Sequence, residues 1–374
     1  MKGRDSKRGR DAVRPTTYAD AGVDTRRAEQ SLAGLLDWVG RSKGLRRGLG
    51  EPLLDIGYFA NVIRLTESLG LAISTDGVGT KLLIAQRMNR LDGVGIDCVA
   101  MNVNDVLCVG AEPIAMVDYL AVEEANPEML AEIGESLYRG AEQARIVIAG
   151  GELAQVREMV RGSAEGRGFD LVGTCVGTVD PNQLILGDDL TDGDTVVGVA
   201  SSGVHSNGLT LARRVFERAG WDLDRHVDEV GGVLGDVLLE PTVIYVSLLE
   251  SLRGAGIRPK ALLHITGDGL LNLTRVKSPA SFVLDALPEP PPIFGLIQRL
   301  GEVSVEEMYA TFNMGVGFCV VCSEAETEEC LRAAAGGPVA AWRLGRVAAD
   351  GRREVRLPSP GLIGRGKRFE RRDR

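Results

Sequence analysis

The eight residues from Ser74 to Lys81, STDGVGTK, carry side chains suited to binding a metal ion together with phosphate. They follow the apolar run 71–73, which predicts a strand that ends in a loop. A carboxylate such as Asp76 can hold Mg²⁺, the glycines let backbone N–H groups approach phosphate oxygens, and Lys81 can neutralise the remaining charge. The spacing differs from that of a Walker A loop. Taken alone, the stretch is explained equally well as a plain glycine-rich turn.

Further acidic residues of the first half follow predicted strands or lie within apolar runs. One such run, 95–110, has apolar residues at helical spacing and also contains Asp97, Asn102, Asn104 and Asp105. Polar groups in a buried helix must be hydrogen-bonded or liganded, which favours a site here. Several acids in such settings suit hard cations that bridge a triphosphate. The predicted cluster consists of Asp76, Asp105, Asp118, Glu152 and Asp170.

Two histidines of the second half stand where predicted strands run into glycine-containing loops. His205 lies in the sequence SSGVHSNG, and His264 lies in HITGDG. Ser206 or Asn207 is predicted to cap the helix that follows the first loop, and the free N–H groups of that helix end form an anion site. The repeated arrangement favours a binding site over two unrelated surface or core histidines.

Helical and strand patterns alternate along the chain, which predicts an α/β protein of the α+β type. We expect helices at 26–39, 81–88, 95–110 and 127–144. We expect strands at 71–75, 113–122, 145–149, 169–180, 194–200 and 341–348, with further strands that lead to His264 and begin near Asn313.

The polar, glycine-rich segment 181–193 predicts a boundary between two domains. We therefore expect a first domain at 16–180 and a second at 181–350. The flanking segments 1–15 and 351–374 are rich in Arg and Lys and are predicted to be solvated basic tails, the first of them disordered. The whole chain of 374 residues has a net charge of −9 although both of its ends are basic, so the body between them is acidic.

Composition excludes several classes of protein. An acidic body disfavours specific nucleic-acid binding. No apolar run reaches the length of a membrane span, and the N-terminus lacks the apolar core of a signal peptide, so we expect a cytoplasmic protein. Cys319 and Cys322 lie in one predicted strand, where their thiols would face opposite sides. Buried thiols are therefore favoured over zinc binding or redox chemistry.

Seven motifs, in this order, resemble those of the aminoimidazole ribonucleotide synthetase family, the phosphoribosylformylglycinamidine cyclo-ligases of purine biosynthesis. The resemblance extends from about Tyr18 to about Val347. The motifs are STDGVGTK (74–81), VND (103–105), GAEP (110–113), GGE (150–152), SGVHSNG (202–208), HITG (264–267) and TFNMGVG (311–317).

This resemblance implies two α/β domains of the family's ATP-binding fold, a homodimer with the first domains packed together, and ATP with Mg²⁺ in a cleft. It implies that formylglycinamidine ribonucleotide and ATP are converted into aminoimidazole ribonucleotide, ADP and phosphate. The first half would then bind the triphosphate, and the second half would bind the ribose 5-phosphate.

The resemblance also assigns residues to roles. It implies catalytic roles for His205, His264 and Lys81. It implies ATP contacts from Asp76, Gly77, Gly79, Thr80, Lys81, Asn104, Asp118 and Gly151. It implies substrate contacts from His205, Ser206, Asn207, Gly208, Thr266, Gly267, Asp268 and Asn313. It implies Mg²⁺ ligation by Asp76, Asp105, Glu152 and Asp170.

The chain departs from the family's usual pattern at three places. Asp268 stands where the family usually has a third glycine, which changes the expected phosphate pocket. Gln155 stands where the family usually has a second acid after the GGE motif. The early glycine-rich loop, 44–50, differs from the common bacterial pattern, so no ATP contact is assigned to it.

Two other functions are compatible with these motifs. The chain could be another ATP-using enzyme of the same fold, such as a small-molecule kinase, although a kinase would not need the paired histidine loops. It could also be a non-catalytic nucleotide-binding subunit whose altered loops no longer support turnover.

Overall fold

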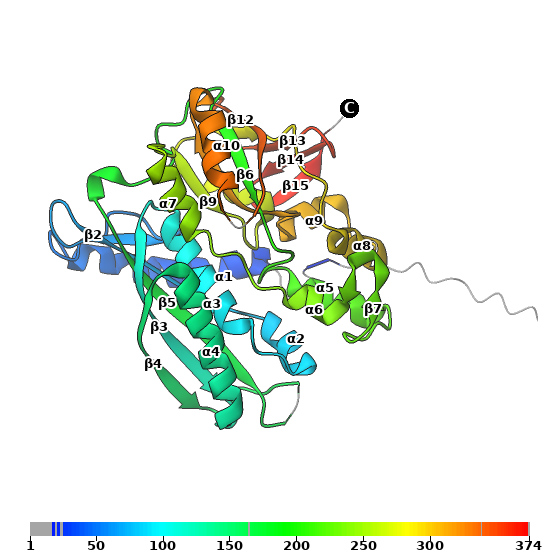
Figure 1. Cartoon of the computed structure of the whole chain (residues 1–374). Helices are drawn as coiled ribbons and strands as arrows, with labels where there is room; N and C mark the ends of the chain where they lie inside the picture. Colours follow the sequence, from blue (N-terminus) through cyan, green and yellow to red (C-terminus); the bar gives the residue numbers. More distant parts are fainter. Residues whose placement is uncertain (1–16, 19–20, 23–24, 164, 338, 373–374) are drawn as a thin grey trace, which may run out of the picture.

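The computed structural model describes residues 17–18, 21–22, 25–163, 165–337 and 339–372. The described residues form two large mixed sheets, each with its own helices, which lie side by side in Figure 1, and one short two-stranded sheet. The predicted N-terminal tail, 1–15, falls outside the described residues. Within the described residues, none of the helices combines the length and the apolar character needed to cross a lipid bilayer.

The first sheet has five strands in the order β1-β2-β5-β3-β4. The elements of this part of the chain are α1 Thr25–Gly40, η1 Arg41–Leu45, β1 Asn61–Arg64, β2 Gly70–Gly77, α2 Lys81–Met88, α3 Val94–Leu107, β3 Glu112–Val122, α4 Pro127–Ala144, β4 Val147–Gln155 and β5 Phe169–Val179.

One face of this sheet is covered by α3, and α4 packs against α3. The two helices approach closely because small residues meet the neighbouring backbone. A Cβ on Gly95 would lie 2.2 Å from the backbone nitrogen of Leu137, so only glycine fits there. Residues of α3 with apolar side chains, including Val99 and Val103, are fully buried. The predicted buried helix is therefore confirmed.

The predicted end of the fourth strand is wrong. The sequence suggests that a strand stops at Ala149 and that Gly150 and Gly151 begin a loop, but β4 continues to Gln155. The strand continues because it pairs in parallel with β3, where Asp118 lies opposite Gly151. The register shifts between Met116 and Val117, where Ala149 is left without a partner, and the ladder then continues through both glycines.

The second sheet has eight strands in the order β15-β14-β13-β10-β12-β6-β11-β9. The elements of this part are η2 Pro181–Gln183, β6 Thr195–Ala200, α5 Leu209–Arg218, β7 His226–Val227, η3 Asp228–Val230, β8 Gly232–Val233, α6 Leu234–Leu239, α7 Val246–Gly254, β9 Ala261–His264, η4 Gly269–Arg275, β10 Ser281–Val283, α8 Pro292–Gly301, α9 Val305–Thr311, β11 Val316–Cys322, η5 Glu324–Glu326, α10 Thr327–Ala335, β12 Ala341–Ala348, β13 Val355–Leu357, β14 Leu362–Arg365 and β15 Arg368–Arg371.

The central strands β6 and β11 are buried along almost their whole length, as expected for strands covered on both faces. Cys319 and Cys322 lie in β11 and are fully buried. Burial raises the pKa of the Cys319 thiol. The prediction of buried thiols is therefore confirmed for this pair.

The prediction of a solvated C-terminal tail is wrong for 355–371, where β13, β14 and β15 extend the second sheet (Figure 1). Charged residues alternate with Leu357, Leu362 and Phe369, which are buried. Glu354 is 3% exposed and binds the guanidinium groups of Arg356 and Arg365. The basic residues of this segment thus face solvent or an acid, while the apolar ones complete the core.

We expect Phe369→Ala to lower the free energy of unfolding by about 3 kcal/mol or more, because it removes a ring that packs edge-on against Tyr309. Arg368→Ala, in the next position but with a side chain 69% exposed, should change it by less than about 1 kcal/mol. Urea unfolding of both variants measures the difference. Equal stability of the two variants would mean that the hairpin is not part of the folded core.

Candidate active site

The two domains meet at a buried ion pair between Lys81, the first residue of α2, and Asp97 of α3. Lys81 Nζ lies 2.7 Å from Asp97 Oδ2, and both side chains are 0% exposed. The ammonium also donates to the carbonyl of Glu240 at 2.7 Å. Asp97 Oδ1 accepts from the backbone N–H and the hydroxyl of Thr242, at 2.8 and 2.7 Å. Two charges of the first domain are therefore satisfied by a segment of the second.

The position of Lys81 differs from the one expected for a phosphate partner. Its ammonium is enclosed with Asp97 and has no surface open to solvent. In this arrangement it cannot contact a ligand. The assignment of Lys81 to catalysis and ATP binding stays a prediction that the geometry does not support.

Further polar residues of α3 also contact the second domain. Asn104 donates to the carbonyl of Val243 at 2.8 Å and accepts from the N–H of Tyr245 at 3.0 Å. Asp105 Oδ1 lies 2.9 Å from His264 Nδ1, the last residue of β9. The expectation that buried polar groups in this helix would be partnered is confirmed.

Asn102, on another face of α3, positions the loop that carries Asp76. Its side-chain oxygen accepts from the N–H of Asp76 at 2.9 Å, and its amide donates to the carbonyl of Asp76 at 3.1 Å. The same amide donates to the carbonyl of Cys98 at 2.8 Å. This two-way contact fixes the backbone at the end of β2.

Asp76 and Asp105 are close enough for their charges to interact. Burial, and then the charge of Asp105, raise the pKa of the Asp76 carboxyl, while the N–H of Gly77 lowers it. Two carboxylates that repel one another in a half-buried site are stabilised by a divalent cation. A cation that bridges phosphates takes its other ligands from phosphate and water, so this pair fits Mg²⁺.

Asp76 and Asp118 share one row across the first sheet. Asp76 pairs with Gly173, Gly173 pairs with Asp118, and Asp118 pairs with Gly151. Paired residues project from the same face of a sheet. That face is the one under α3, because a Cβ on Gly173 would lie 2.7 Å from the amide of Asn102. Burial raises the pKa of the Asp118 carboxyl.

Glu152 and Asp170 are not brought to this row. Glu152 directly follows Gly151, and Asp170 lies three residues before Gly173. Because side chains alternate along a strand, both acids point to the opposite face of the sheet. Within the described part of the chain, no three His, Cys, Asp or Glu side chains are arranged as metal ligands. The predicted set Asp76, Asp105, Glu152 and Asp170 is therefore not assembled within one chain.

His205 is almost completely buried, at 1% exposed. Its Nε2 accepts from the N–H of Ser202 at 3.2 Å and from that of Val243 at 3.5 Å, so Nδ1 carries the proton of the neutral ring. Burial, and then the charges of His264 and Lys81, hold the pKa of His205 well below its usual range. His205 thus connects its loop to the interdomain segment.

Both histidines keep one ring nitrogen without a partner. His205 Nδ1 and His264 Nε2 are buried and make no hydrogen bond within the described chain. Because His264 is also fully buried, neither ring is open to a ligand in this arrangement. Their catalytic roles stay predictions, and they require a movement that exposes these atoms.

The loops that carry the two histidines face each other. A Cβ on Gly267 would lie 3.2 Å from Asn207 Oδ1. Gly208 has φ of +76° and stands against the ring of Phe312, where a Cβ would lie 2.3 Å from a ring carbon. Asn313 donates to the carbonyl of Gly203 at 2.9 Å. The predicted substrate residues therefore lie in three adjoining loops.

The predicted cap of α5 is wrong. Gly208 occupies the cap position without a side-chain hydrogen bond. Ser206 instead contacts Asp97 at 3.2 Å and Thr242 at 3.1 Å, because the loop turns toward the buried ion pair. Thr80 approaches the same helix, with its hydroxyl 2.9 Å from that of Thr210.

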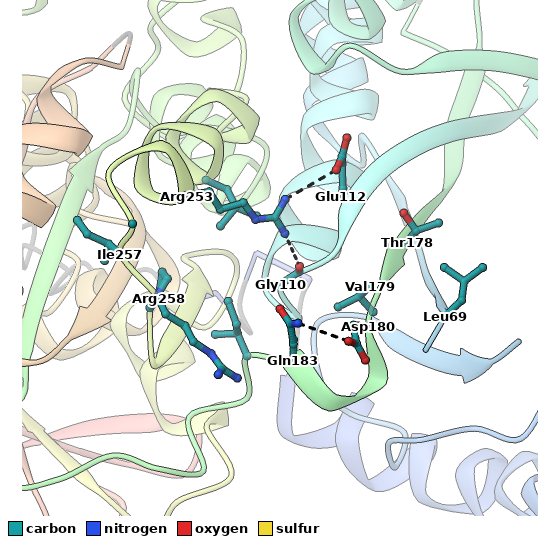
Figure 2. Close-up of a pocket in the computed structure, with 14 residues that line it drawn as sticks. Leu69, Gly110, Glu112, Thr178, Val179, Asp180, Gln183, Arg253, Ile257 and Arg258 are labelled. Carbon is teal, nitrogen blue, oxygen red and sulfur yellow. Dashed lines mark hydrogen bonds and ion pairs between the residues drawn. The ribbon is translucent and has the colours of Figure 1, made fainter. Parts of the chain in front are cut away.

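A cavity of about 450 Å³ lies at the other end of the first sheet, between the domains (Figure 2). Arg253 donates to the carbonyl of Gly110 at 2.8 Å and lies 3.8 Å from Glu112. Gln183 of the linker donates to Asp180 at 3.4 Å. Gly110 and Glu112 of the GAEP motif line this cavity, but none of the residues assigned a catalytic, ATP, substrate or metal role from the sequence does, so it is separate from the candidate site.

Two family models match the chain. Residues 57–179 match the family described as AIR synthase related protein, N-terminal domain, and residues 191–358 match AIR synthase related protein, C-terminal domain. The fold and the site therefore define a two-domain protein of this class. The chain belongs to the AIR synthase-related family.

Relatives similar along both domains have one name. Phosphoribosylformylglycinamidine cyclo-ligase of Methanosarcina acetivorans is 43% identical over 321 residues, which is 86% of this chain and 92% of the relative. Proteins of that name from Methanothermobacter thermautotrophicus and Pyrococcus furiosus are each 44% identical, over 84% of this chain and 90% of each relative.

Solved structures show the same fold at lower identity. A thiamine-monophosphate kinase from Stenotrophomonas maltophilia has a TM-score of 0.56 and 20% identity, and covers 87% of this chain and 95% of its own. A hydrogenase maturation protein HypE in complex with ATP has a TM-score of 0.55 and 21% identity, with 77% and 81% covered. At this identity, the likeness concerns the fold alone.

We expect Asp97→Ala to reduce the free energy of unfolding by about 3–5 kcal/mol, because the Lys81 ammonium would stay buried without its counter-ion. Glu229→Ala, which breaks the exposed contact with Arg299, should cost less than about 1 kcal/mol. Urea unfolding of both variants provides the comparison. Similar losses of unfolding free energy in the two variants would show that the buried ion pair contributes no more to stability than the exposed one.

We expect the stability of the protein to fall as the pH drops below about 6.5, in part because of His205. The unfolded chain binds a proton on this residue, while the folded chain keeps it neutral, so the unfolded state gains protons first. The contribution reaches at most about 1.4 kcal/mol per pH unit.

His205→Gln should therefore make the pH dependence of unfolding flatter between about pH 6.5 and 5. His226→Gln, at a histidine whose side chain is 63% exposed, is the matched control and should leave the slope unchanged. Urea unfolding at several pH values measures both. A wild-type slope in His205→Gln would rule out this residue as a source of the acid sensitivity.

Proposed function

We propose that the chain catalyses an ATP-dependent ring closure, in which formylglycinamidine ribonucleotide and ATP give aminoimidazole ribonucleotide, ADP and phosphate. The observation that carries this proposal is the 42–44% identity, along both domains, to relatives named phosphoribosylformylglycinamidine cyclo-ligase. This reaction belongs to de novo purine biosynthesis, and it forms a carbon–nitrogen bond. We place it in the cytoplasm, because its phosphorylated substrates do not cross membranes unaided.

The reaction requires activation of a poor leaving group. The formyl amide oxygen of the substrate attacks the γ-phosphorus of ATP, and ADP departs. The amidine nitrogen then attacks the activated carbon, phosphate leaves with the former amide oxygen, and proton loss completes the ring. Such a site must hold a triphosphate and a ribose 5-phosphate at the same time.

The triphosphate end of the site is formed by the loop after β2 and the row of carboxylates beside it. Asp76 and Asp105 would hold Mg²⁺, which would neutralise charge on the phosphates. Gly79 and Thr80 would present backbone N–H groups to phosphate oxygens, and Gly77, whose own N–H donates to Asp76 Oδ1 at 2.8 Å, would let the chain approach the phosphates closely. Further proposed ATP contacts are Asn104, Asp118 and Gly151.

The substrate end is formed by the three adjoining loops of the second domain. His205, Ser206, Asn207 and Gly208 come from the first loop, and Asn313 supports it through Gly203. Thr266, Gly267 and Asp268 come from the loop after His264. The backbone N–H groups of these last three residues donate to no acceptor within the described chain, which leaves them for a ligand or water.

We further propose that two chains pair through the uncovered face of the first sheet. Val117 and Tyr119 of β3 are 46% and 45% exposed, and Val147 of the edge strand β4, which pairs with Ala115 on the same face, is 63% exposed. Apolar side chains on a sheet face without covering helices favour a partner surface. A second copy of the same face would cover them symmetrically.

The activity test combines the purified protein with ATP, Mg²⁺ and formylglycinamidine ribonucleotide. We expect equimolar ADP, phosphate and aminoimidazole ribonucleotide. Asp76→Asn should lower turnover about 100-fold by weakening the metal site. Asp228→Asn, at a fully exposed side chain, should leave turnover unchanged. ATP binding without product formation would contradict the proposed activity and favour a nucleotide-binding subunit.

The dimer proposal is tested by sedimentation. We expect the wild-type chain to sediment as a dimer and the double variant Val117→Lys, Tyr119→Lys to sediment as a monomer, because the new charges would be buried without partners. Tyr138→Lys, at an exposed site on α4, should remain dimeric. A wild-type monomer at micromolar concentration would refute the pairing.

A further inference from the structure

A group of charged side chains covers the loop after His264, and one of its members comes from the C-terminal hairpin. Asp268 Oδ2 binds Lys367 Nζ, and it also binds Arg275 Nη2 at 3.3 Å. The carboxylate is 18% exposed, whereas the side chains of Lys367 and Arg275 are 38% and 32% exposed. Two cations thus surround one carboxylate, and both keep surface open to solvent.

The fold fixes the position of Lys367. Lys367 and Gly366 form the two-residue turn between β14 and β15, since Arg365 pairs with Arg368. Gly366 has φ of +57°, which glycine adopts without strain in such a turn. The hairpin is attached to the rest of the second domain by Phe369, whose ring packs against Tyr309 of α9. Lys367 is therefore presented by ordered structure.

Arg275 is also fixed. It lies at the end of η4, and its guanidinium carbon is 4.8 Å from the centre of the Phe59 ring. A cation over an aromatic face is stabilised by the electrons of the ring. Arg275 thus reaches Asp268 while it contacts a residue of the first domain.

The charged group lies where the two substrate loops meet. Gly267, next to Asp268, faces Asn207 of the other loop. Tyr18 joins the same region. Burial is the main cause that raises the pKa of its phenol, the Gly208 backbone opposes this rise, and the charge of Asp268 adds to it. The charges are therefore placed at the proposed binding site for the ribonucleotide.

An isolated carboxylate would repel the phosphate of the substrate, which carries a charge of about −1.5 to −2 at neutral pH. The two cations reverse this effect, because they leave the group with a net positive charge. Each also keeps free donors after bonding to Asp268, since an ammonium has three N–H groups and a guanidinium has five. The group can therefore bind a phosphate monoester directly.

We propose that Lys367 and Arg275 form part of the phosphate subsite for the ribonucleotide, with Asp268 as the residue that positions both. This inference rests on the proposed function and extends the substrate site to the C-terminal hairpin. The ligand class is the phosphate monoester of a ribose, bound by charge-assisted hydrogen bonds.

The first test compares steady-state kinetics of the full-length wild-type chain, Lys367→Met, Lys367→Arg and Arg368→Met. Lys367→Met keeps the aliphatic stem and removes the charge, and Arg368→Met is the matched control in the same hairpin. We expect Lys367→Met to raise KM for the ribonucleotide about ten-fold. KM for ATP and kcat should stay within about two-fold. Lys367→Arg should restore most of the loss, and Arg368→Met should behave as wild type.

A purely structural role for Lys367 makes a different prediction. In that case Lys367→Met would lower the thermal midpoint and would change KM for both substrates together. That result, or an unchanged KM for the ribonucleotide, would overturn the proposal.

The second test does not depend on turnover. Ribose 5-phosphate is titrated into the wild-type chain and Lys367→Met by calorimetry, with ribose as the uncharged control. We expect about ten-fold weaker binding of ribose 5-phosphate to the variant and no binding of ribose. If the wild type lacks turnover but shows this difference, the proposed function fails while the subsite stands. If turnover is present and the two affinities are equal, the subsite fails alone.

Discussion

The buried ion pair between Lys81 and Asp97 is the contact on which the relation between the two domains depends. Neither side chain is exposed, and the pair is completed by the carbonyl of Glu240 and the two donors of Thr242. Removing two charges from water is costly, and the cost is offset only when every donor and acceptor is present. The first domain therefore reaches a stable arrangement only with the segment 240–242 against it. This requirement allows the two domains to dock in one relative position. A purely apolar interface would allow one domain to slide against the other.

Helix α3 makes further specific polar contacts along the interface between the domains. Asp97, Asn104 and Cys108 are spaced by seven and four residues, so they share one helix face, and that face contacts the second domain. Asp105 reaches His264 next to it. Asn102 lies on another face and holds the backbone of Asp76. One buried helix thus fixes the loop proposed for ATP relative to the strand that leads to the substrate loops. A small shift of α3 would therefore move both ends of the proposed site.

The C-terminal segment shows that charge composition gives a wrong structural prediction when strand pairing is not considered. Residues 355–371 are rich in arginine, yet they form three strands whose alternate side chains are buried. The guanidinium groups of Arg356 and Arg365 converge on Glu354, and Arg365 reaches it only because β14 pairs with β13. Strand-end signals misled in a similar way at Gly150 and Gly151, because pairing with β3 continues through them. In both places, pairing with another strand decides the structure, and β13 and β4 each pair with a strand that other elements separate from them in the sequence.

The sequence by itself determined most elements, the two-domain α/β architecture and the family, because apolar periodicity and short motifs are local properties. Helices α2 and α4 and strand β12 begin and end where their patterns predict. The sequence also identified α3 as a buried helix whose polar residues need partners. Only the tertiary structure decided what those partners are. It enclosed Lys81 with Asp97, sent Glu152 and Asp170 to the other face of the sheet, and brought Lys367 to Asp268. The physical reason is that side-chain direction and burial depend on strand register and domain docking. These are long-range properties, and the residue types and spacing within a single motif do not determine them.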